Sequence, residues 1–160
     1  MLLRNLIDIV SKGGNYLLNI SPTGTGVIPE PSVERLNEMG QWLRVNGEAI
    51  YDCGPTPFGR EVGQYSETEK DRSGKPMFIP AWKWRATTQP GKLYILLFEW
   101  PTAKMELPRV QSKITKAYLL ADRGQTPLMV IQAESGVSVS LPEEPPSKIA
   151  SVLCLELASN

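Results

Sequence analysis

Residues 10–23 carry the sequence VSKGGNYLLNISPT, in which three structural signals follow one another. Gly13 and Gly14 mark the end of a helix, because glycine readily adopts the left-handed conformation found there. Residues 15–20 are largely apolar on both faces, as is typical of a strand buried in a parallel sheet. Residues 21–29 are rich in proline, glycine and threonine, which indicates a loop. The stretch therefore predicts a helix end, a buried strand and a loop in succession.

A helix is predicted on each side of this strand. The first has one apolar face at helical spacing, formed by Leu2, Leu3, Leu6, Ile7 and Val10. The second is expected to begin at Pro31 or Ser32 and to stop at Asn46 and Gly47. Its predicted core stripe comprises Val33, Leu36, Met39, Trp42 and Leu43. Helix, strand and helix in this order form one unit of an α/β architecture.

The sequence changes character after the second helix. A polar, turn-rich connector is predicted over residues 53–80, and from residue 81 onward the pattern becomes that of β-strands. The predicted strands are residues 82–87, 93–98, 114–120, 128–131, 136–141 and 149–157. Glycine and proline separate these strands at the spacing of an antiparallel sandwich.

The composition is that of a globular protein and excludes several classes of function. Among 160 residues, 41% are hydrophobic and 21% are charged, and 17 basic residues balance 17 acidic ones. We therefore expect no nucleic acid and no membrane as partners, because these need a basic surface or a long apolar span. The N-terminal residues mix charges into an apolar pattern, unlike a signal peptide, and indicate no compartment.

Histidine and cysteine limit the chemistry further. The chain has no histidine, which removes Ser-His-Asp and Cys-His catalysis and most zinc sites. We expect neither a metal nor a cofactor. Two separate thiols are the favoured interpretation of Cys53 and Cys154, and a disulfide between them is the alternative.

Residues 10–29, together with residues 40–51 (GQWLRVNGEAIY), closely resemble α-L-fucosidases of glycoside hydrolase family 29. In that family such a block ends the (β/α)8 catalytic barrel, and a β-sandwich follows it. The resemblance implies an α+β chain in which residues 1–52 are a helix-strand-helix remnant of a (β/α)8 barrel. Residues 53–80 are then the connector, and residues 81–160 form the antiparallel β-sandwich. The match is specific up to residue 52, and beyond it only architecture and position agree.

The activity that the resemblance implies is hydrolysis of terminal α-L-fucosides with retention of configuration, with fucosylated glycans as partners. This reaction needs two carboxyl groups about 5–5.5 Å apart. In the family, the nucleophilic aspartate, the acid/base carboxylate and the sugar-binding histidines lie on barrel segments upstream of this block. We therefore expect this chain to be a fucosidase or a C-terminal fragment of one, without the usual catalytic carboxylates.

Two other hypotheses remain open. The β-sandwich can be a non-catalytic module that binds carbohydrate or another protein. Alternatively, the chain hydrolyses fucosides by itself with a substitute carboxylate pair. Glu34 and Glu38 share a helix face, and Glu143 and Glu144 lie in a proline-rich turn, but both pairs are better explained as solvated surface.

Candidate substrate-binding residues follow the predicted strand. Asn19, Ser21 and Thr23 lie at its C-terminal end, which faces the active site in a (β/α)8 barrel. The alternative is that their side chains satisfy backbone groups of the following turn, and both interpretations stand. The adjacent Gly13-Gly14-Asn15 lacks the lysine and further glycines of a phosphate-binding loop.

Aromatic residues of the sandwich are candidates for sugar stacking. Trp82 and Trp84 are expected on one face of their strand, with Trp100 and Tyr94 nearby in sequence. Because sandwich cores also use tryptophan, the pattern favours a core or interface role over a sugar platform.

The barrel remnant poses a physical problem, because a lone parallel strand leaves unpaired backbone on both edges. We expect residues 1–47 to pack their helices against the sandwich, to pair with another copy of the chain as a homo-oligomer, or to be partly disordered.

Overall fold

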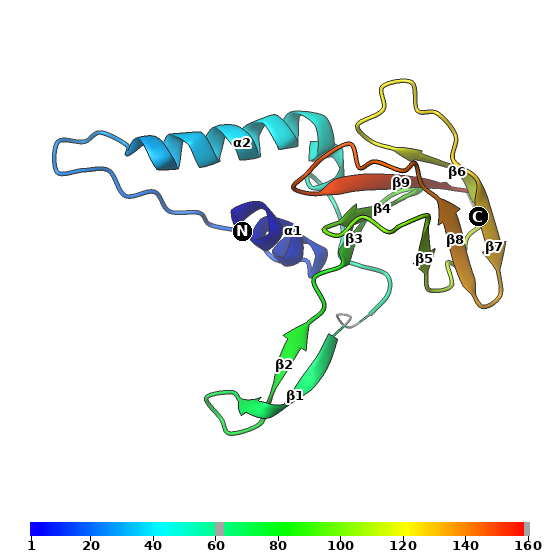
Figure 1. Ribbon diagram of the computed structural model, residues 1–160, viewed down its shortest axis with the longest axis horizontal. Helices are drawn as coiled ribbons and strands as arrows, with labels where there is room; N and C mark the ends of the chain where they lie inside the picture. The colour runs from blue at the N-terminus through cyan, green and yellow to red at the C-terminus, as the bar shows by residue number, and fades with distance from the viewer. Residues whose placement is uncertain (60–62, 159–160) are drawn as a thin grey trace.

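The computed structural model describes residues 1–59 and 63–158, and its ribbon is drawn in Figure 1. The helical elements are α1 (Leu2–Ser11), α2 (Glu30–Asn46) and a 3-10 turn, η1 (Gly47–Ala49). A hairpin follows, formed by β1 (Gly63–Lys70) and β2 (Pro76–Pro80). The remaining strands are β3 (Trp84–Gln89), β4 (Lys92–Leu97), β5 (Lys104–Leu107), β6 (Ile114–Leu119), β7 (Val130–Ala133), β8 (Gly136–Ser140) and β9 (Ser151–Leu157).

Seven of these strands form the predicted antiparallel sandwich. One sheet has four strands in the order β3-β4-β9-β6, and the other has three in the order β5-β8-β7. The two sheets enclose an apolar core between them. Its buried members are Ala86, Leu93, Ile95, Leu97, Met105, Leu107, Ala117, Leu119, Val137, Val139, Leu153 and Leu155.

The helices add a third layer on the other face of the four-stranded sheet (Figure 1). A second core lies between them and that sheet, and its buried members are Leu3, Ile7, Trp42, Ala49, Ile50, Tyr94, Leu96, Phe98, Tyr118, Ala150, Val152 and Cys154. The central strands β4 and β9 are therefore buried on both faces, which explains why their sequences are apolar at successive positions rather than alternating. The expectation that the helices pack against the sandwich is confirmed.

Helix α1 ends as the sequence predicts. The amide of Gly13 donates to the carbonyl of Val10, and that of Gly14 donates to the carbonyl of Ile9, both at 2.9 Å. Gly13 has a φ of +76°. This pattern is a Schellman motif, which explains why a residue without a side chain is needed there. The two glycines thus close a helix and bind no phosphate group.

Helix α2 begins at Glu30, one residue before the predicted start, and ends at Asn46. Of its predicted core stripe only Trp42 is buried, while Met39 and Leu43 pack partly against the core. Figure 1 gives the reason, because the first turns of α2 extend past the edge of the sheet.

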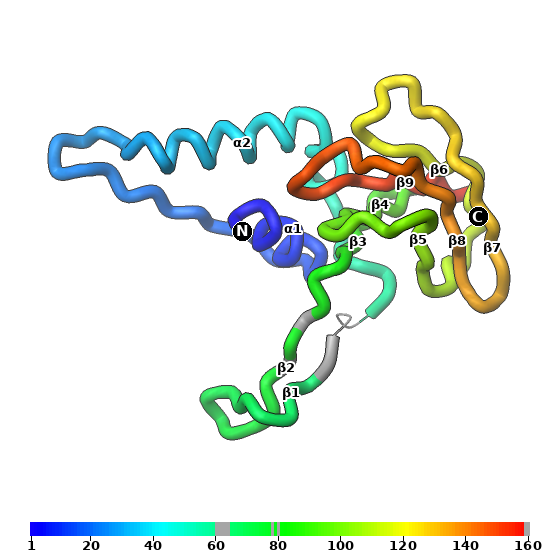
Figure 2. The backbone as a smooth tube through the Cα atoms, in the orientation of Figure 1, coloured from blue at the N-terminus to red at the C-terminus, as the bar shows by residue number. Residues whose placement is uncertain are grey.

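The predicted buried strand at residues 15–20 does not form in this structure. These residues have no regular secondary structure, and Leu17 is 93% exposed. We call residues 14–28 the arm, because they leave α1, turn back and enter α2 away from both sheets (Figure 2). A parallel strand needs neighbouring strands to satisfy its backbone, and the described residues place none beside the arm.

Two strand features were absent from the sequence-based prediction. The connector contains the β1–β2 hairpin, whose turn is held by Asp71: its Oδ1 accepts from the amides of Ser73 (2.8 Å) and Lys75 (3.0 Å). Strand β1 is polar. Strand β2 carries the apolar Met77 and Ile79, but both are exposed, at 37% and 41%, in a segment that was predicted to be a turn-rich connector. Strand β5 is only four residues long and was also missed.

Cys53 and Cys154 are both free thiols, which agrees with the favoured interpretation. Burial raises the pKa of the Cys53 thiol, and it raises that of Cys154 to about 11. Both thiols are therefore protonated and poorly nucleophilic near neutral pH. Within the described ranges, neither helix has the length and apolar character needed to cross a membrane.

Candidate functional site

The candidate substrate-binding residues lie on the arm. Asn19, Ser21 and Thr23 are all exposed to solvent. The hydroxyl oxygen of Thr23 accepts from the amide of Val27 at 3.2 Å, and the amide of Thr23 donates to the carbonyl of Val27 at 2.9 Å. Thr23 therefore stabilises the tip of the arm, as expected of a turn residue. In this structure the three residues face water.

The acidic residues weighed as a substitute catalytic pair are surface residues. Glu34 and Glu38 on α2, and Glu143 and Glu144 in the loop before β9, are exposed. A retaining glycosidase needs one carboxyl group held protonated by a pocket that excludes water. Such a pocket encloses neither pair. Across residues 1–59 and 63–158, no three histidine, cysteine or acidic side chains gather as a metal site would require.

Asp8 is a carboxylate whose side chain is only 14% exposed, and it already has partners. Its Oδ1 accepts from Nε of Arg85 at 2.6 Å, and its Oδ2 accepts from Nζ of Lys12 at 2.6 Å. The side chain of Arg85 is only 6% exposed. Its guanidinium also donates to the carbonyls of Ala81 and Trp84. This ion pair joins α1 to β3. Asp8 therefore has a structural role and is not available as a catalytic carboxylate.

A second polar cluster joins η1 to β4. The Tyr94 hydroxyl donates to Oε1 of Glu48 at 2.6 Å, and Lys92 pairs with the same oxygen. Both hydrogen bonds lower the pKa of Glu48, and the one from Lys92 has the larger effect. The pKa of Lys92 is raised by the same contact. Glu48 is therefore held as a carboxylate, which suits a structural contact and not a general acid.

Trp82 and Trp84 separate in the structure, so the expectation that they share a face is wrong. Trp82 lies in a turn before β3 and packs against the core under the helices, with the Arg85 guanidinium 4.8 Å from its ring and Phe98 5.8 Å away. Trp84 begins β3 and packs at the sandwich core. Two residues of a strand share a face only when both belong to the strand, and Trp82 precedes it.

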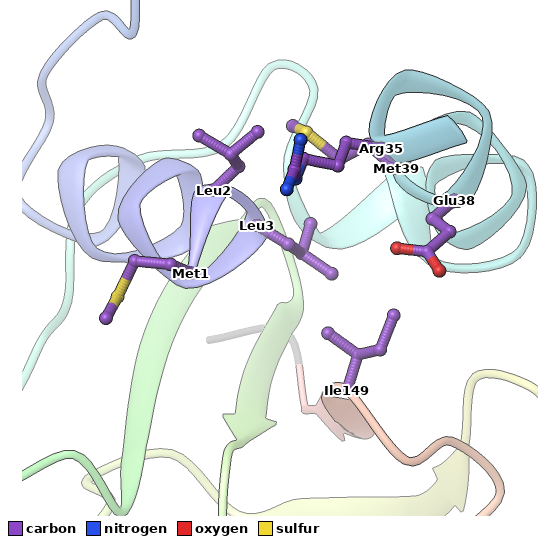
Figure 3. A pocket seen from close by; sticks show the side chains of 7 residues that line it. All are labelled: Met1, Leu2, Leu3, Arg35, Glu38, Met39 and Ile149. Carbon is purple, nitrogen blue, oxygen red and sulfur yellow. The ribbon is translucent and has the colours of Figure 1, made fainter. Parts of the chain in front are cut away.

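One pocket lies between the two helices and has a volume of about 250 Å³. Figure 3 shows Leu2 and Leu3 of α1 facing Met39 of α2, with Ile149 below them. Arg35 and Glu38 stand on the α2 side. The pocket is therefore mainly apolar, with one charge of each sign at its edge.

A second pocket, of about 310 Å³, lies at one end of the sandwich. Trp84 and Trp100 contribute aromatic rings to it, and charged side chains of both signs surround them. The sequence placed Trp100 among the aromatic candidates for sugar binding, but it gave no reason to expect Trp100 beside Trp84. No local signal could have paired them, because the rest of β3, strand β4 and two turns separate them along the chain.

Comparison with known proteins identifies what the chain is similar to. A family model described as alpha-L-fucosidase matches residues 1–48. The tissue alpha-L-fucosidase of Mus musculus is 35% identical over 153 residues, which covers 91% of this chain and 29% of that protein. The plasma alpha-L-fucosidase of Homo sapiens is 32% identical over 145 residues, covering 89% and 28% respectively.

Solved structures agree with the sequence matches. Alpha-L-fucosidase isoenzyme 1 from Paenibacillus thiaminolyticus superposes with a TM-score of 0.76 and 27% identity, over 99% of this chain and 34% of that one. The Thermotoga maritima alpha-fucosidase in complex with fucose gives a TM-score of 0.71 and 25% identity, over 96% and 33%. The chain thus spans less than a third of the length of these curated relatives, and about a third of these solved chains.

Proposed function

We propose that this chain is the C-terminal portion of an α-L-fucosidase of glycoside hydrolase family 29, and its similarity in sequence and fold to about a third of the length of such enzymes supports this. The function that follows is a contribution to retaining hydrolysis of terminal α-L-fucosides in fucosylated glycans. One observation carries the proposal: how much of each chain the structural superposition includes. Nearly all of the chain, but only a third of the Paenibacillus enzyme, takes part in the superposition.

The catalytic carboxylates of this proposal come from polypeptide outside these 160 residues. The described acidic residues that were considered as a catalytic pair are exposed. Asp8, which is partly buried, forms ion pairs with Arg85 and Lys12. The mechanism needs one carboxylate as nucleophile and a second carboxyl group as acid and then base. A barrel joined to this chain supplies both, and the chain supplies the last barrel segments and the sandwich.

The arm gives this assembly a physical basis. Leu17, Val27 and Ile28 are exposed on it, at 93%, 61% and 43%. Burying such side chains against neighbouring barrel strands is favourable, at roughly 25 cal/mol for each Å² of apolar surface. We therefore assign residues 1–52 to the end of the barrel, residues 53–80 to the connector and residues 81–160 to the sandwich.

Asn19, Ser21 and Thr23 are then the proposed sugar contacts of the chain. If residues 15–20 pair with barrel strands, these three residues follow the strand at the end that faces the active site. Trp84 keeps its candidacy for sugar stacking, because its indole lines a pocket. For Trp82, the contacts with Arg85 and Phe98 support the core interpretation over stacking.

A chimera tests the proposal. The C-terminal third of the Paenibacillus enzyme is replaced by this chain, and hydrolysis of a chromogenic α-L-fucoside is measured beside that of the isolated chain. We expect turnover by the chimera and none by the isolated chain. Asn19→Ala in the chimera should lower kcat/KM, and Glu34→Ala, on the exposed face of α2, is the matched control.

Two results would contradict this proposal. One is a chimera that is folded and monodisperse but inactive. The other is turnover by the isolated chain that disappears when Glu34, Glu38, Asp52 or Glu61 is replaced singly by alanine; Glu61 lies outside the described residues.

A second copy of the chain, in place of barrel strands, is an alternative partner that could cover the exposed arm. The exposed apolar residues of the arm are compatible with a homo-oligomer that pairs two arms. Light scattering across a concentration series measures this directly. A dimer that dissociates when Leu17 and Val27 are changed to serine would support the pairing, and a monomer at all concentrations would exclude it.

A further inference from the structure

The pocket at the end of the sandwich has features of a ligand site. It is lined by residues at the edge strands β3 and β5 of the two sheets and by the loop between β4 and β5. Its volume of about 310 Å³ is at the lower end of the roughly 300–1,000 Å³ typical of small-molecule sites. Two tryptophans line it although neither is fully buried. A large aromatic side chain left partly exposed in a concave site suggests contact with a ligand.

Both indoles are held in place before any ligand binds. Nε1 of Trp100 donates to the carbonyl of Pro142 at 3.0 Å. The ring of Trp84 meets the edge of Phe58, with 5.5 Å between centroids and an angle of 87°. Side chains fixed in this way lose little conformational freedom on binding, so weak stacking contacts can still give measurable affinity.

The rim of the pocket carries charges that cancel. Lys83 and Lys104 supply two positive charges, and Glu99 and Glu106 supply two negative ones. Lys104 and Glu106 form an ion pair at 3.5 Å, with side chains 62% and 63% exposed. An ion pair this exposed is weak and can exchange its partners for those of a ligand. The rim therefore offers both hydrogen-bond donors and acceptors without favouring either sign of charge.

We propose that this pocket binds one neutral sugar unit, which is either a terminal residue or a branch of an oligosaccharide. A sugar ring has an apolar C–H face that suits an indole surface, and hydroxyl groups that both donate and accept hydrogen bonds, as this rim requires. A charged ligand would be attracted by half of the rim and repelled by the other half. The open, small site fits a dissociation constant of about 1–10 mM for one sugar unit.

This site is separate from the proposed barrel contacts. Residues 19–23 lie on the arm, and Figure 1 places the arm and β5 at opposite sides of the molecule. The inference therefore does not rest on the hydrolytic function, and it is tested with the 160-residue chain without any turnover. An inactive chimera would not contradict the proposed sugar site. Equally, a failure to bind sugar at this pocket would not contradict the proposed hydrolytic function.

The chain contains its own controls for an NMR titration. It has four tryptophans, and each gives one indole N–H signal. Trp84 and Trp100 line the pocket, whereas Trp42 and Trp82 belong to the core under the helices. On titration with L-fucose, D-galactose or N-acetylglucosamine, we expect the signals of Trp84 and Trp100 to shift in a saturable way while the other two stay in place.

Variants and charged sugars complete the test. Trp100→Ala should weaken binding about fivefold or more, as expected for removal of an anchoring aromatic group. Glu106→Gln, an exposed change, should weaken binding without altering the fold, and Trp82→Phe should leave it unchanged. The proposal is overturned if no neutral sugar shifts the two signals, if all four signals shift equally, or if glucuronate or glucosamine binds tenfold more tightly than the neutral sugars.

Discussion

Residues 15–20 (NYLLNI) and residues 93–98 (LYILLF) are similar apolar runs with opposite surroundings. The second run is almost entirely β4, and its residues are all buried, with Tyr94, Ile95 and Leu96 at 0% exposure. The first is part of the arm, and its Leu17 is 93% exposed. A run that is apolar on both faces requires two covering layers. Among the described residues, layers cover both faces of β4 and none covers the arm.

The largest expected difference between the two runs is in amide hydrogen exchange. Strand β4 is paired with β3 and β9 on its two edges, whereas the arm has no strand partner among the described residues. We expect the amides of β4 to exchange only when the whole molecule opens. We expect protection factors in residues 93–97 to exceed those in residues 16–20 by about 10³ or more. Mass spectrometry of deuterium uptake checks this. Equal protection in the two runs would show that the arm is covered in solution.

The next largest expected difference is in the free energy of unfolding when one side chain in each run is truncated to alanine. Ile95→Ala should lower the free energy of unfolding by about 4 kcal/mol, because the methyl groups removed leave a cavity between two layers. Leu17→Ala should change it by less than about 0.5 kcal/mol. Urea unfolding measures both. A cost for Leu17→Ala close to that for Ile95→Ala would mean that the two runs are not different in solution.

The ion pair that joins α1 to β3 should matter almost as much. Asp8→Ala leaves the Arg85 guanidinium buried without its carboxylate, and we expect a loss of about 3 kcal/mol. Glu34→Ala, which removes an exposed carboxylate, should be close to neutral and serves as the control. Thermal unfolding monitored by circular dichroism compares the two variants. Similar midpoints would indicate that the ion pair does not anchor α1.

The smallest effect is expected at the edge of the buried run, where Glu48 meets Lys92 and Tyr94. Its pKa is lowered from the ordinary 4.5, so the carboxylate stabilises the fold at pH values above 4.5. That stabilisation is lost as the pH falls through the lowered pKa. Since the Glu48 side chain is 42% exposed, the contribution should stay below about 1 kcal/mol.

Unfolding of Glu48→Gln between pH 6 and pH 3 measures this contribution. The variant should lose less stability than the parent chain over that interval. A variant with the same acid dependence as the parent would show that Glu48 has no part in it.

Much of the fold could be predicted from local sequence. The Schellman end of α1 follows from Gly13 and Gly14, and the end of α2 follows from Asn46 and Gly47. Most strands of the sandwich were predicted from apolar runs between turns. Of the strands that were missed, β1 is polar, β5 has only four residues, and β2 is a short apolar run between two prolines inside a polar connector. None of them shows a long alternation of apolar and polar residues.

The candidate site was less predictable. The resemblance of residues 10–51 pointed to the α-L-fucosidases, and the comparisons confirm that lineage. The separation of Trp82 from Trp84 could not be foreseen, because it depends on a strand boundary, which local pattern locates poorly. Nor does any spacing rule bring Trp100 beside Trp84.

The sequence by itself determined where the helices end, which segments are apolar and that the sandwich follows the helices. These properties arise from backbone preferences and side-chain patterns within a few residues. Only the tertiary structure decided which apolar runs are covered and which charges meet, as with Asp8 and Arg85, 77 positions apart. Burial and ion pairing require segments distant along the chain to come together, and a local pattern carries no record of whether the covering layer is present.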